Sequence, residues 1–490
     1  MQGEFKGDVT RDTFCPEKNF SRVLMQQGRV LLDADWNEQT SILLHYLRSL
    51  AADIIGEHGG PKDGFGFAIG VEPKPGESPP FGLTKLEWDK LKLKKDDFVI
   101  GKGHYYVGGI LCENDDHLAF SLQPDNPGAT PLSDTPRMKF LVYLDVWERH
   151  VSYLQDADTD NPNIREVALG GPDTATRARV VWQVKLKETD IRVEKARNGY
   201  PEFLAELGEL IRPSTGRLRA RARKPETDGE DCACVTSPES RYRGVENQLY
   251  RVEIHRSGVA SNGGLKDEKS TGGAAATFKW SRENASVVFR IRKPVASGNG
   301  ETTVALSDLG RDARFGLKEG DWVEIVDDDY ILQNRAESLL RVHAINREEC
   351  SVTLRGVPGS NVGQEVNKHP LLRRWDHRGG ASKSGGLTIH KDGAALVQEG
   401  SGDNSWLHLE DGVQIQFQEL KPSANYQTGD YWLIPARVAT GNVEWPGPVN
   451  DPASLPPHGI EHHYAPLALI VIGTGSVTDL RRTFTPLTLL

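Results

Sequence analysis

The side chains with the greatest potential for catalysis or metal binding gather near the C-terminus. Residues 457–464 read Pro-His-Gly-Ile-Glu-His-His-Tyr, so His458, Glu461, His462 and His463 lie close together along the chain. Imidazole and carboxylate groups at this density could bind zinc or nickel. The proline and glycine predict a loop, however, and the H-E-x-x-H spacing that fixes two histidines on one helix face is absent. We therefore interpret these histidines as structural, keep a metal site as the alternative, and predict no cofactor.

Acidic and basic runs elsewhere each admit a binding role beside a structural one. Three consecutive aspartates at 327–329 follow a predicted strand and could bind calcium, but they lack EF-hand spacing and favour an acidic turn. Arg217, Arg219, Arg221 and Arg223 alternate along the chain, which places them on one face of a strand. Such a face favours an acidic protein surface, or protection of a sheet edge, over a nucleic acid.

Common motifs of catalysis and nucleotide binding are absent from the sequence. There is no G-x-S-x-G, no phosphate-binding G-x-x-x-x-G-K-[ST] and no dinucleotide-binding fingerprint. The ten tryptophans suit core and interface packing, although sugar-binding platforms use the same residue. We therefore predict that the protein is not an enzyme and has no catalytic residue.

Composition and charge restrict the partners and the compartment. The net charge of −10 opposes nucleic-acid binding, because such binding needs a positive surface. No apolar run reaches the ~20 residues of a membrane span, and the N-terminus lacks a signal-peptide pattern. Five cysteines suit reduced thiols, with a bridge or metal at Cys232 and Cys234 as the alternative. We expect a protein made in the cytoplasm, with no nucleic-acid partner and no membrane span.

A helix is predicted behind an extended arm that covers residues 1–30. Asp33 or Asp35 could cap this helix, and Gly56 ends it. Its apolar or near-apolar positions follow a heptad pattern; they are Trp36, Thr40, Leu43, Leu47, Leu50 and Ile54. Such a seam packs either on the helix's own domain or along the symmetry axis of a homo-oligomer.

The rest of the chain shows the short, turn-bounded apolar segments of a β protein, and its 50 glycines and 28 prolines supply the turns. Segments expected as strands are 98–100, 104–107, 110–112, 140–147, 180–186, 217–223, 248–254, 276–280, 286–291, 322–326, 351–354, 387–390, 396–399, 406–409, 413–417, 431–436 and 467–472. Residues 200–212 suggest a second, short helix. The predicted fold class is mainly β and multi-domain, with several small antiparallel sandwich-like or barrel-like domains beside the N-terminal arm and α-helix.

Polar and glycine-rich runs divide the sequence into five predicted segments. They are the arm and oligomerisation helix at 1–64, a first β domain at 65–195, a linker with a short helix and a basic strand at 196–239, a second β domain at 240–378 and a C-terminal β domain at 379–490.

The N-terminal arm and helix resemble a known family. Residues 5–14 and 20–39 are similar to the start of an uncharacterised bacterial family encoded beside genes for contractile injection systems and phage-tail-like particles. More loosely they resemble the arm of phage tail and baseplate proteins, where an aromatic-x-Arg-x-Leu-x-x-x-Gly-Arg run precedes a helix with an Asn-Glu pair. The matching residues here are Phe20, Arg22, Leu24, Gly28, Arg29, Asn37 and Glu38. The likeness continues over 145–149, 165–174, 242–255, 279–284, 429–437 and 462–467.

This resemblance implies a place in a particle and no catalytic residue. Together with the heptad seam it leads to our hypothesis of a structural component (baseplate, fibre or surface adaptor protein) of a contractile injection system or phage-tail-like particle. Its expected partners are further copies of itself, as in a homotrimer, and other tail or baseplate proteins. Such a particle would stay in the cytoplasm or be released from the cell. The alternative is a particle-borne protein that binds or degrades carbohydrate, with a cell-surface glycan as its partner.

Overall fold

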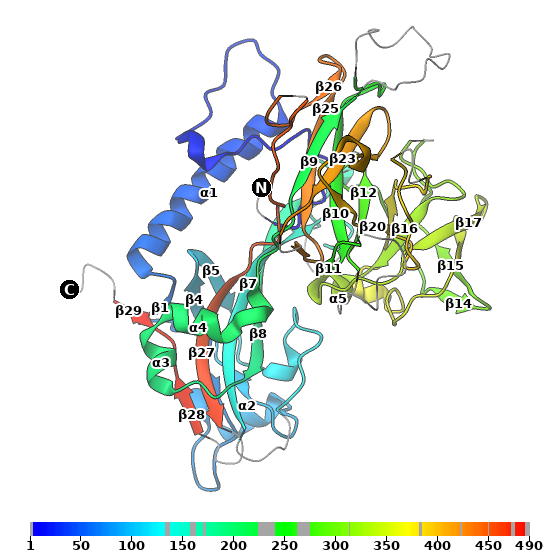
Figure 1. Ribbon diagram of the computed structural model, residues 1–490. Coiled ribbons are helices and arrows are strands. Elements are labelled where there is room, and N and C mark those ends of the chain that lie inside the picture. Colours follow the sequence, from blue (N-terminus) through cyan, green and yellow to red (C-terminus); the bar gives the residue numbers. More distant parts are fainter. Residues whose placement is uncertain are drawn as a thin grey trace. The chain divides into compact units, whose positions relative to one another are not determined.

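The protein is built mainly from short β-strands (Figure 1). Strands account for 35% of the chain and helices for 16%, in several separate and mostly antiparallel sheets, so the predicted fold class is confirmed. The computed structural model describes residues 3–132, 138–156, 163–169, 173–223, 241–261, 275–312, 314–381, 385–421, 424–448, 450–471 and 476–485. Cys232 and Cys234, the predicted C-x-C pair, lie outside the described residues.

The chain forms two compact units, and each unit combines three separate stretches of sequence. Unit 1 comprises Met1–Thr13, His150–Arg177 and Pro213–Ile460. Unit 2 comprises Phe14–Arg149, Ala178–Arg212 and Glu461–Leu490. Each of the five segments predicted above is continuous in sequence. Unit 1 is not continuous, because the chain leaves it after Thr13 and returns to it at His150 and again at Pro213.

Unit 1 contains two large sheets. The five-stranded sheet has the order β20-β12-β10-β25-β26, with bounds Ala395–Leu396, Thr277–Ser281, Gln248–Arg256, Tyr431–Arg437 and Asn442–Val443. The seven-stranded sheet has the order β13-β19-β16-β17-β18-β15-β14, with bounds Val288–Arg290, Leu371–Trp375, Trp322–Val326, Leu340–Asn346, Ser351–Arg355, Glu301–Ala305 and Ala296–Gly298. An isolated β-bridge joins Ile291, which follows β13 at one end of this sheet, to Leu306, which follows β15 near the other end.

Smaller elements complete unit 1. Strand β23 (Val413–Gln418) pairs with β9 (Leu218–Ala222), β22 (Leu407–His408) and β21 (Glu399–Gly400). Strands β11 and β24 form a two-stranded sheet, and α5 is a short helix; their bounds are Gly258–Val259, Asn425–Tyr426 and Asp328–Leu332. Single 3-10 turns lie at Val167–Leu169, Val366–Lys368 and Asp403–Ser405.

Strand β10 shows why these segments form a layered fold. Side chains alternate across a strand, so Tyr250, Val252 and Ile254 share one face and pack into a hydrophobic core. The opposite face carries Arg251 and Glu253, which are also buried. One face of this central strand is therefore apolar and the other charged, and the charged face defines the site described below.

Unit 2 contains three sheets. They have the orders β29-β1-β4-β5, β2-β3-β6 and β28-β27-β7-β8. In the first sheet the strands, in the order given, are Thr483–Phe484, His58–Pro61, Gly103–Val107 and Ile110–Asn114. In the second sheet they are Ile69–Gly70, Val99–Ile100 and Leu118–Ala119. In the third sheet they are Ser476–Asp479, His463–Val471, Lys139–Val151 and Arg177–Glu188. Helices and 3-10 turns of this unit are α1 (Asp33–Ile55), α2 (Lys85–Lys90), α3 (Val193–Asn198), α4 (Tyr200–Leu207), Pro16–Lys18, Pro80–Gly82, Phe120–Leu122 and Gly208–Ile211.

Helix α4 covers one face of the third of these sheets. Phe203 and Leu207 are fully buried against Leu141 of β7 and Leu469 of β27. The predicted short helix at 200–212 is therefore present, but its last turn is a 3-10 helix that ends at Ile211.

Helix α1 starts differently from the prediction. Its N-cap is Leu32, which supplies no side-chain cap, so neither Asp33 nor Asp35 caps the helix. Both aspartates lie in the first turn instead, where a negative charge interacts favourably with the helix dipole. The helix ends at Gly56 as predicted, and this residue has a φ of 88° that favours glycine.

Most predicted strands match observed ones, with one clear exception. Residues 387–390 form no strand, because Leu387 and Ile389 make only isolated bridges, to Gly379 and Ala395. Within the described ranges, no helix combines the length and the apolar character needed to cross a membrane.

Candidate functional site

Side chains of unit 1 hold the N-terminal arm by its backbone. The Tyr431 hydroxyl donates a hydrogen bond to the Gly3 carbonyl (2.8 Å). Arg251 and Asn284 both donate to the Phe5 carbonyl at 3.2 Å, and Asn284 also donates to the Gly7 carbonyl at 2.9 Å. Because the acceptors are main-chain oxygens, these bonds fix the path of the arm without depending on its side chains.

A second set of contacts holds the far end of the arm. The Arg437 guanidinium donates to the Thr10 carbonyl at 2.9 Å. Arg11 and Arg437 both pair with the carboxylate of Glu444, at 3.0 and 3.3 Å. The arm is thus fastened at both ends of residues 3–11.

Lys6 joins the arm to a buried chain of alternating charges. Its Nζ lies 2.5 Å from Glu4 and 3.4 Å from Glu253. Glu253 also pairs with Arg251 (2.6 Å) and with Lys279 (3.5 Å). Three cations therefore surround one carboxylate that is almost fully buried.

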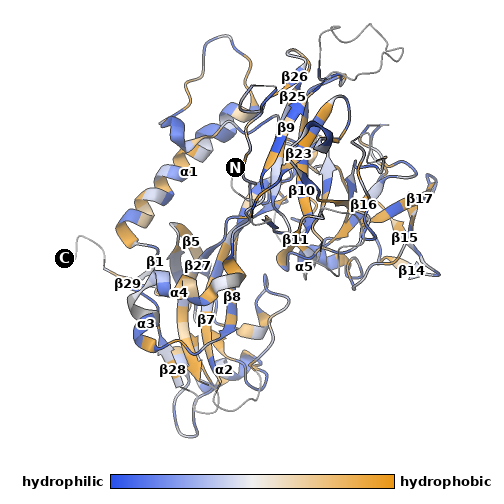
Figure 2. Ribbon diagram, in the orientation of Figure 1, coloured by the Kyte–Doolittle hydropathy of each residue, from blue (hydrophilic) through white to orange (hydrophobic). Residues whose placement is uncertain are grey.

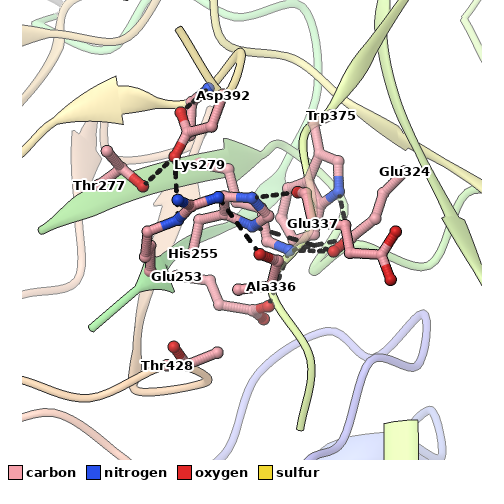
Figure 3. Close-up of polar contacts among 12 residues, drawn as sticks. Glu253, His255, Thr277, Lys279, Glu324, Ala336, Glu337, Trp375, Asp392 and Thr428 are labelled. Atoms are coloured by element: carbon pink, nitrogen blue, oxygen red, sulfur yellow. Dashed lines mark hydrogen bonds and ion pairs between the residues drawn. The ribbon is translucent and has the colours of Figure 1, made fainter. Parts of the chain in front are cut away.

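The chain of charges continues into the seven-stranded sheet, as Figure 3 shows. Lys279 Nζ lies 2.7 Å from Glu324, and its ammonium group lies 4.4 Å from the centre of the Trp375 ring. The Trp375 indole and the Tyr330 hydroxyl each donate a hydrogen bond to Glu324, at 2.9 and 3.0 Å. The carboxylate of Glu324 thus has three donors, which a buried charge requires.

The electrostatics of this cluster favour ionised carboxylates. Burial alone would raise the pKa of Glu253, but Lys6, Arg251 and Lys279 outweigh it and hold that pKa far below its usual value. Burial likewise opposes ionisation of Glu324, yet Lys279 holds its pKa at about 2. Nearby, burial and the charge of Lys279 lower the pKa of His255 to about 4, so this imidazole is neutral.

Strand geometry places these residues on one surface. Arg251, Glu253 and His255 share one face of β10 because they alternate along it. Residues on neighbouring strands lie directly opposite Glu253, namely Lys279 on β12 and Tyr431 on β25. The cavity beside the cluster measures about 40 Å³, which holds water molecules but is far smaller than the ~300 Å³ of a small ligand pocket. This geometry is suited to anchoring a segment of chain.

Beyond the anchored arm, the predicted arm-motif residues are solvent-exposed. Phe20, Arg22, Leu24, Gly28 and Arg29 are all exposed. The Val23 amide donates a hydrogen bond to the Gln39 side chain (2.8 Å), which ties this part of the arm to α1. The remaining motif residues, Asn37 and Glu38, are half-buried on that helix.

The heptad seam of α1 is exposed along its whole length. Between 53% and 77% of each seam side chain is accessible; these residues are Trp36, Leu43, Leu47, Leu50 and Ile54. Only Ala34 and Ile42 of α1 are buried. Figure 2 shows hydrophobic colour along α1, strongest toward its C-terminal end. The seam therefore does not pack against its own chain.

Residues 14–20, which follow the anchored arm, enclose a pocket together with α1 in unit 2. It measures about 130 Å³, and Phe14, Phe20, Ile42 and Tyr46 provide its apolar lining. Together with the seam, this pocket adds to the apolar side chains that residues 14–55 expose.

The four candidate metal ligands divide between the two units. His458 belongs to unit 1, where its backbone pairs with Tyr431 and burial lowers its pKa to about 4. Glu461, His462 and His463 belong to unit 2, where His462 Nδ1 lies 2.7 Å from Asp145. In the part of the chain that is described, no three His, Cys, Asp or Glu side chains are arranged to hold a metal ion.

The other two candidate binding runs are also explained by internal contacts. Asp327 caps α5 by accepting a hydrogen bond from the Tyr330 amide, so the calcium alternative has no ligand set there. On β9, Arg221 stacks on Trp406 at 3.9 Å and Arg219 pairs with Asp451 at 2.5 Å. The arginine face thus meets acidic and aromatic residues of its own unit.

Comparison with known proteins places the chain in a family. A model described as a family of unknown function (DUF6519) matches residues 5–198 and 209–479, which is most of the sequence. The chain belongs to the DUF6519 family. No curated protein and no solved structure matches it. Both the anchored arm of this DUF6519 protein, from Phe5 onward, and its exposed helix lie within the matched residues.

The arm-holding residues of the DUF6519 chain were not predicted as a site. Arg251, Asn284, Tyr431 and Arg437 fall within segments singled out above for their family resemblance, but no role could be assigned to them. A buried polar face on a strand, with polar side chains alternating at 251, 253 and 255, was the signal that could have indicated a buried contact.

Proposed function

We propose that this protein is a structural component of a contractile injection system or phage-tail-like particle and acts by homo-oligomeric assembly. The observation that carries the proposal is the concentration of exposed apolar side chains on the arm and α1. Of 21 large hydrophobic residues exposed within the described ranges, 13 lie between Phe20 and Ile54. An exposed apolar patch of this extent is typical of an interaction surface.

The heptad order of the seam supports a second copy of the chain as the partner. Leu43 and Leu50 occupy d positions, and Leu47 and Ile54 occupy a positions, which pack as knobs into holes between parallel helices. Leu44 and Tyr46 flank the seam and are also exposed. A two-stranded coil needs only a and d, whereas a wider apolar face suits a bundle, so we favour three copies.

The mass of the full-length protein in solution tests the assembly. Light scattering after size-exclusion chromatography should give about three times 54.2 kDa. Leu47→Glu places a charge in the seam and should yield monomers, because a charge cannot be buried there unpaired. Leu86→Glu, at an exposed leucine of α2, is the matched control and should leave the mass unchanged.

The place in a particle needs a separate test. A cryo-EM map of purified tail-like particles from a producing cell should contain density for this chain on a symmetry axis. A strictly monomeric chain that is absent from such particles would contradict the proposal.

The carbohydrate alternative depends on tryptophan platforms, and the tryptophans offer little support. Six of the ten are buried; they are Trp88, Trp147, Trp280, Trp375, Trp406 and Trp432. The one that is largely exposed is Trp36, which lies on the helical seam.

A further inference from the structure

We propose that, within the oligomer, the N-terminal arm of each copy occupies the groove of a neighbouring copy. The groove consists of the unit 1 residues that hold the arm, namely Arg251, Asn284, Tyr431, Arg437 and Glu253. Its occupant is residues 3–11 of a second copy. This inference rests on the homo-oligomer proposed above and names the contact that locks it.

The groove requires an occupant at all times. Without the arm, Arg251, Asn284 and Tyr431 would lose buried hydrogen-bond acceptors, at a cost of about 1–3 kcal/mol for each unsatisfied donor. Glu253 would lose Lys6, one of its three cations. Every groove in an assembly must therefore contain one arm.

The contacts are equally suited to an arm from another copy. They join groove side chains to backbone carbonyls of Gly3, Phe5, Gly7 and Thr10, and to the charge of Lys6. In a closed symmetric oligomer, giving one arm and receiving one arm conserves every such bond. Exchange therefore costs no contact within the groove.

The segment behind the arm can serve as the crossing. The boundary between the two compact units falls directly after Thr13, so the arm belongs to unit 1 and the following residues belong to unit 2. Residues 19–32 form no helix and no strand. The 9 residues from 24 to 32 lie between the Val23–Gln39 hydrogen bond and α1, and they can span up to about 30 Å when extended, which is enough to reach an adjacent helix of a neighbouring subunit.

Exchange also explains the side chains of that segment. Leu24, Met25, Val30 and Leu31 are between 54% and 80% exposed, although they lie between an anchored arm and a helix. Four such residues in a simple solvent-exposed loop would be unfavourable, at roughly 1.5–3 kcal/mol of lost burial for each. A crossing between subunits would cover them, and it leads directly into the exposed seam that starts at Trp36.

A photo-cross-linking experiment on the full chain tests this inference. Two differently tagged copies are co-expressed, and only the first carries p-benzoyl-phenylalanine in place of Phe5. Irradiation should join the two tags, with the linked peptide mapping to residues 248–256 or 277–284 of the second copy. The mixed product should be about half of all cross-links, since each neighbour is of either type with equal odds.

The controls separate this inference from the assembly itself. The same photo-reactive residue at Val357, an exposed position of unit 1, should give no link to the groove peptides. An oligomer whose arm cross-links lie only within single copies would overturn arm exchange and leave the assembly intact. A monomer in light scattering would overturn both.

Discussion

Glu253 and Glu324 show how single residues decide what the buried cluster can do. Each is almost fully buried, and each stays ionised because cations and hydrogen-bond donors surround it. A carboxylate held so far below its usual pKa does not accept a proton at neutral pH, so neither residue is suited to general-base catalysis. Their chemistry is that of a permanent anchor for Lys6 and Lys279.

Removing Lys279 should severely destabilise unit 1. Lys279→Met leaves Glu253 and Glu324 facing each other with fewer cations, and breaking a buried pair costs about 3–5 kcal/mol. Urea unfolding monitored by circular dichroism would measure this loss. Lys293→Met, at an exposed lysine, should change the free energy of unfolding by less than about 0.5 kcal/mol. Equal effects of the two substitutions would show that the buried pairs contribute nothing.

Acid should weaken the protein through the same carboxylates. The folded pKa of Glu324, about 2, lies below its ordinary 4.5, so the unfolded chain takes up the proton first as the pH falls. Its stabilising effect is therefore complete above pH 4.5 and is lost as the pH drops toward 2. Glu283 has a pKa that burial raises to about 8, so in the folded protein it is already protonated throughout this range.

Comparing Glu324→Gln with the native chain isolates this effect. The variant should lose stability less steeply between pH 4.5 and 3, because one titrating carboxylate is gone. Urea unfolding curves at several pH values provide the slopes, and parallel slopes would disprove a depressed pKa at Glu324.

At the level of elements, the heptad seam of α1 contains one polar residue, Thr40. Thr40 lies at an a position between Trp36 and Leu43, and its hydroxyl bonds to the Trp36 carbonyl of its own helix. Polar residues at such positions specify register and oligomer state at a cost in stability. In the proposed oligomer the seam would thus contain one site where specificity and affinity conflict.

Thr40→Ile should therefore strengthen the proposed assembly. An added apolar side chain in a packed seam contributes about 1–2 kcal/mol per helix, so the oligomer should resist dilution to lower concentrations. Analytical ultracentrifugation would measure the shift in dissociation constant. Ser49→Ile lies on the same helix outside the seam and should produce no shift; a similar effect of both variants would indicate non-specific adhesion.

Individual elements could be predicted where the local pattern alone determines them. Residues 322–326 form β16 with the predicted bounds, because an apolar run follows a Gly-Asp turn. Strands β15 and β17 were missed, since charged and polar side chains alternate with their buried residues and mask the apolar pattern. The groove could not be predicted, because Phe5, Arg251, Asn284 and Tyr431 meet only through tertiary folding.

On the scale of the whole molecule, both units depend on distant parts of the chain. Strand β10 pairs with β25, which lies more than 170 residues further along the sequence. The predicted 240–378 segment contains β10 and β12 but lacks β25, β20 and β23. The segment would then lack sheet neighbours of β10 and β12 and two thirds of the buried residues of a hydrophobic core.

A fragment covering residues 240–378 should therefore fail to fold cooperatively. A fragment covering residues 213–460 retains every strand of the unit 1 sheets; with a peptide of residues 1–13 added to fill the groove, it should give a dispersed NMR spectrum and a single unfolding transition. A well-folded 240–378 fragment would support that segment as an independent domain.

The absorption and fluorescence of Trp375 are sensitive to the charges of the buried cluster, because its side chain contacts two of them. Its indole N–H faces the negative Glu324, and its ring faces the positive Lys279. Two opposite charges on one chromophore impose an electric field across it, and a field of this kind shifts the energy of the excited state. The emission colour and near-ultraviolet dichroism of Trp375 should therefore change when Glu324 takes up a proton, so spectroscopy could follow the charge state of the cluster without any attached dye.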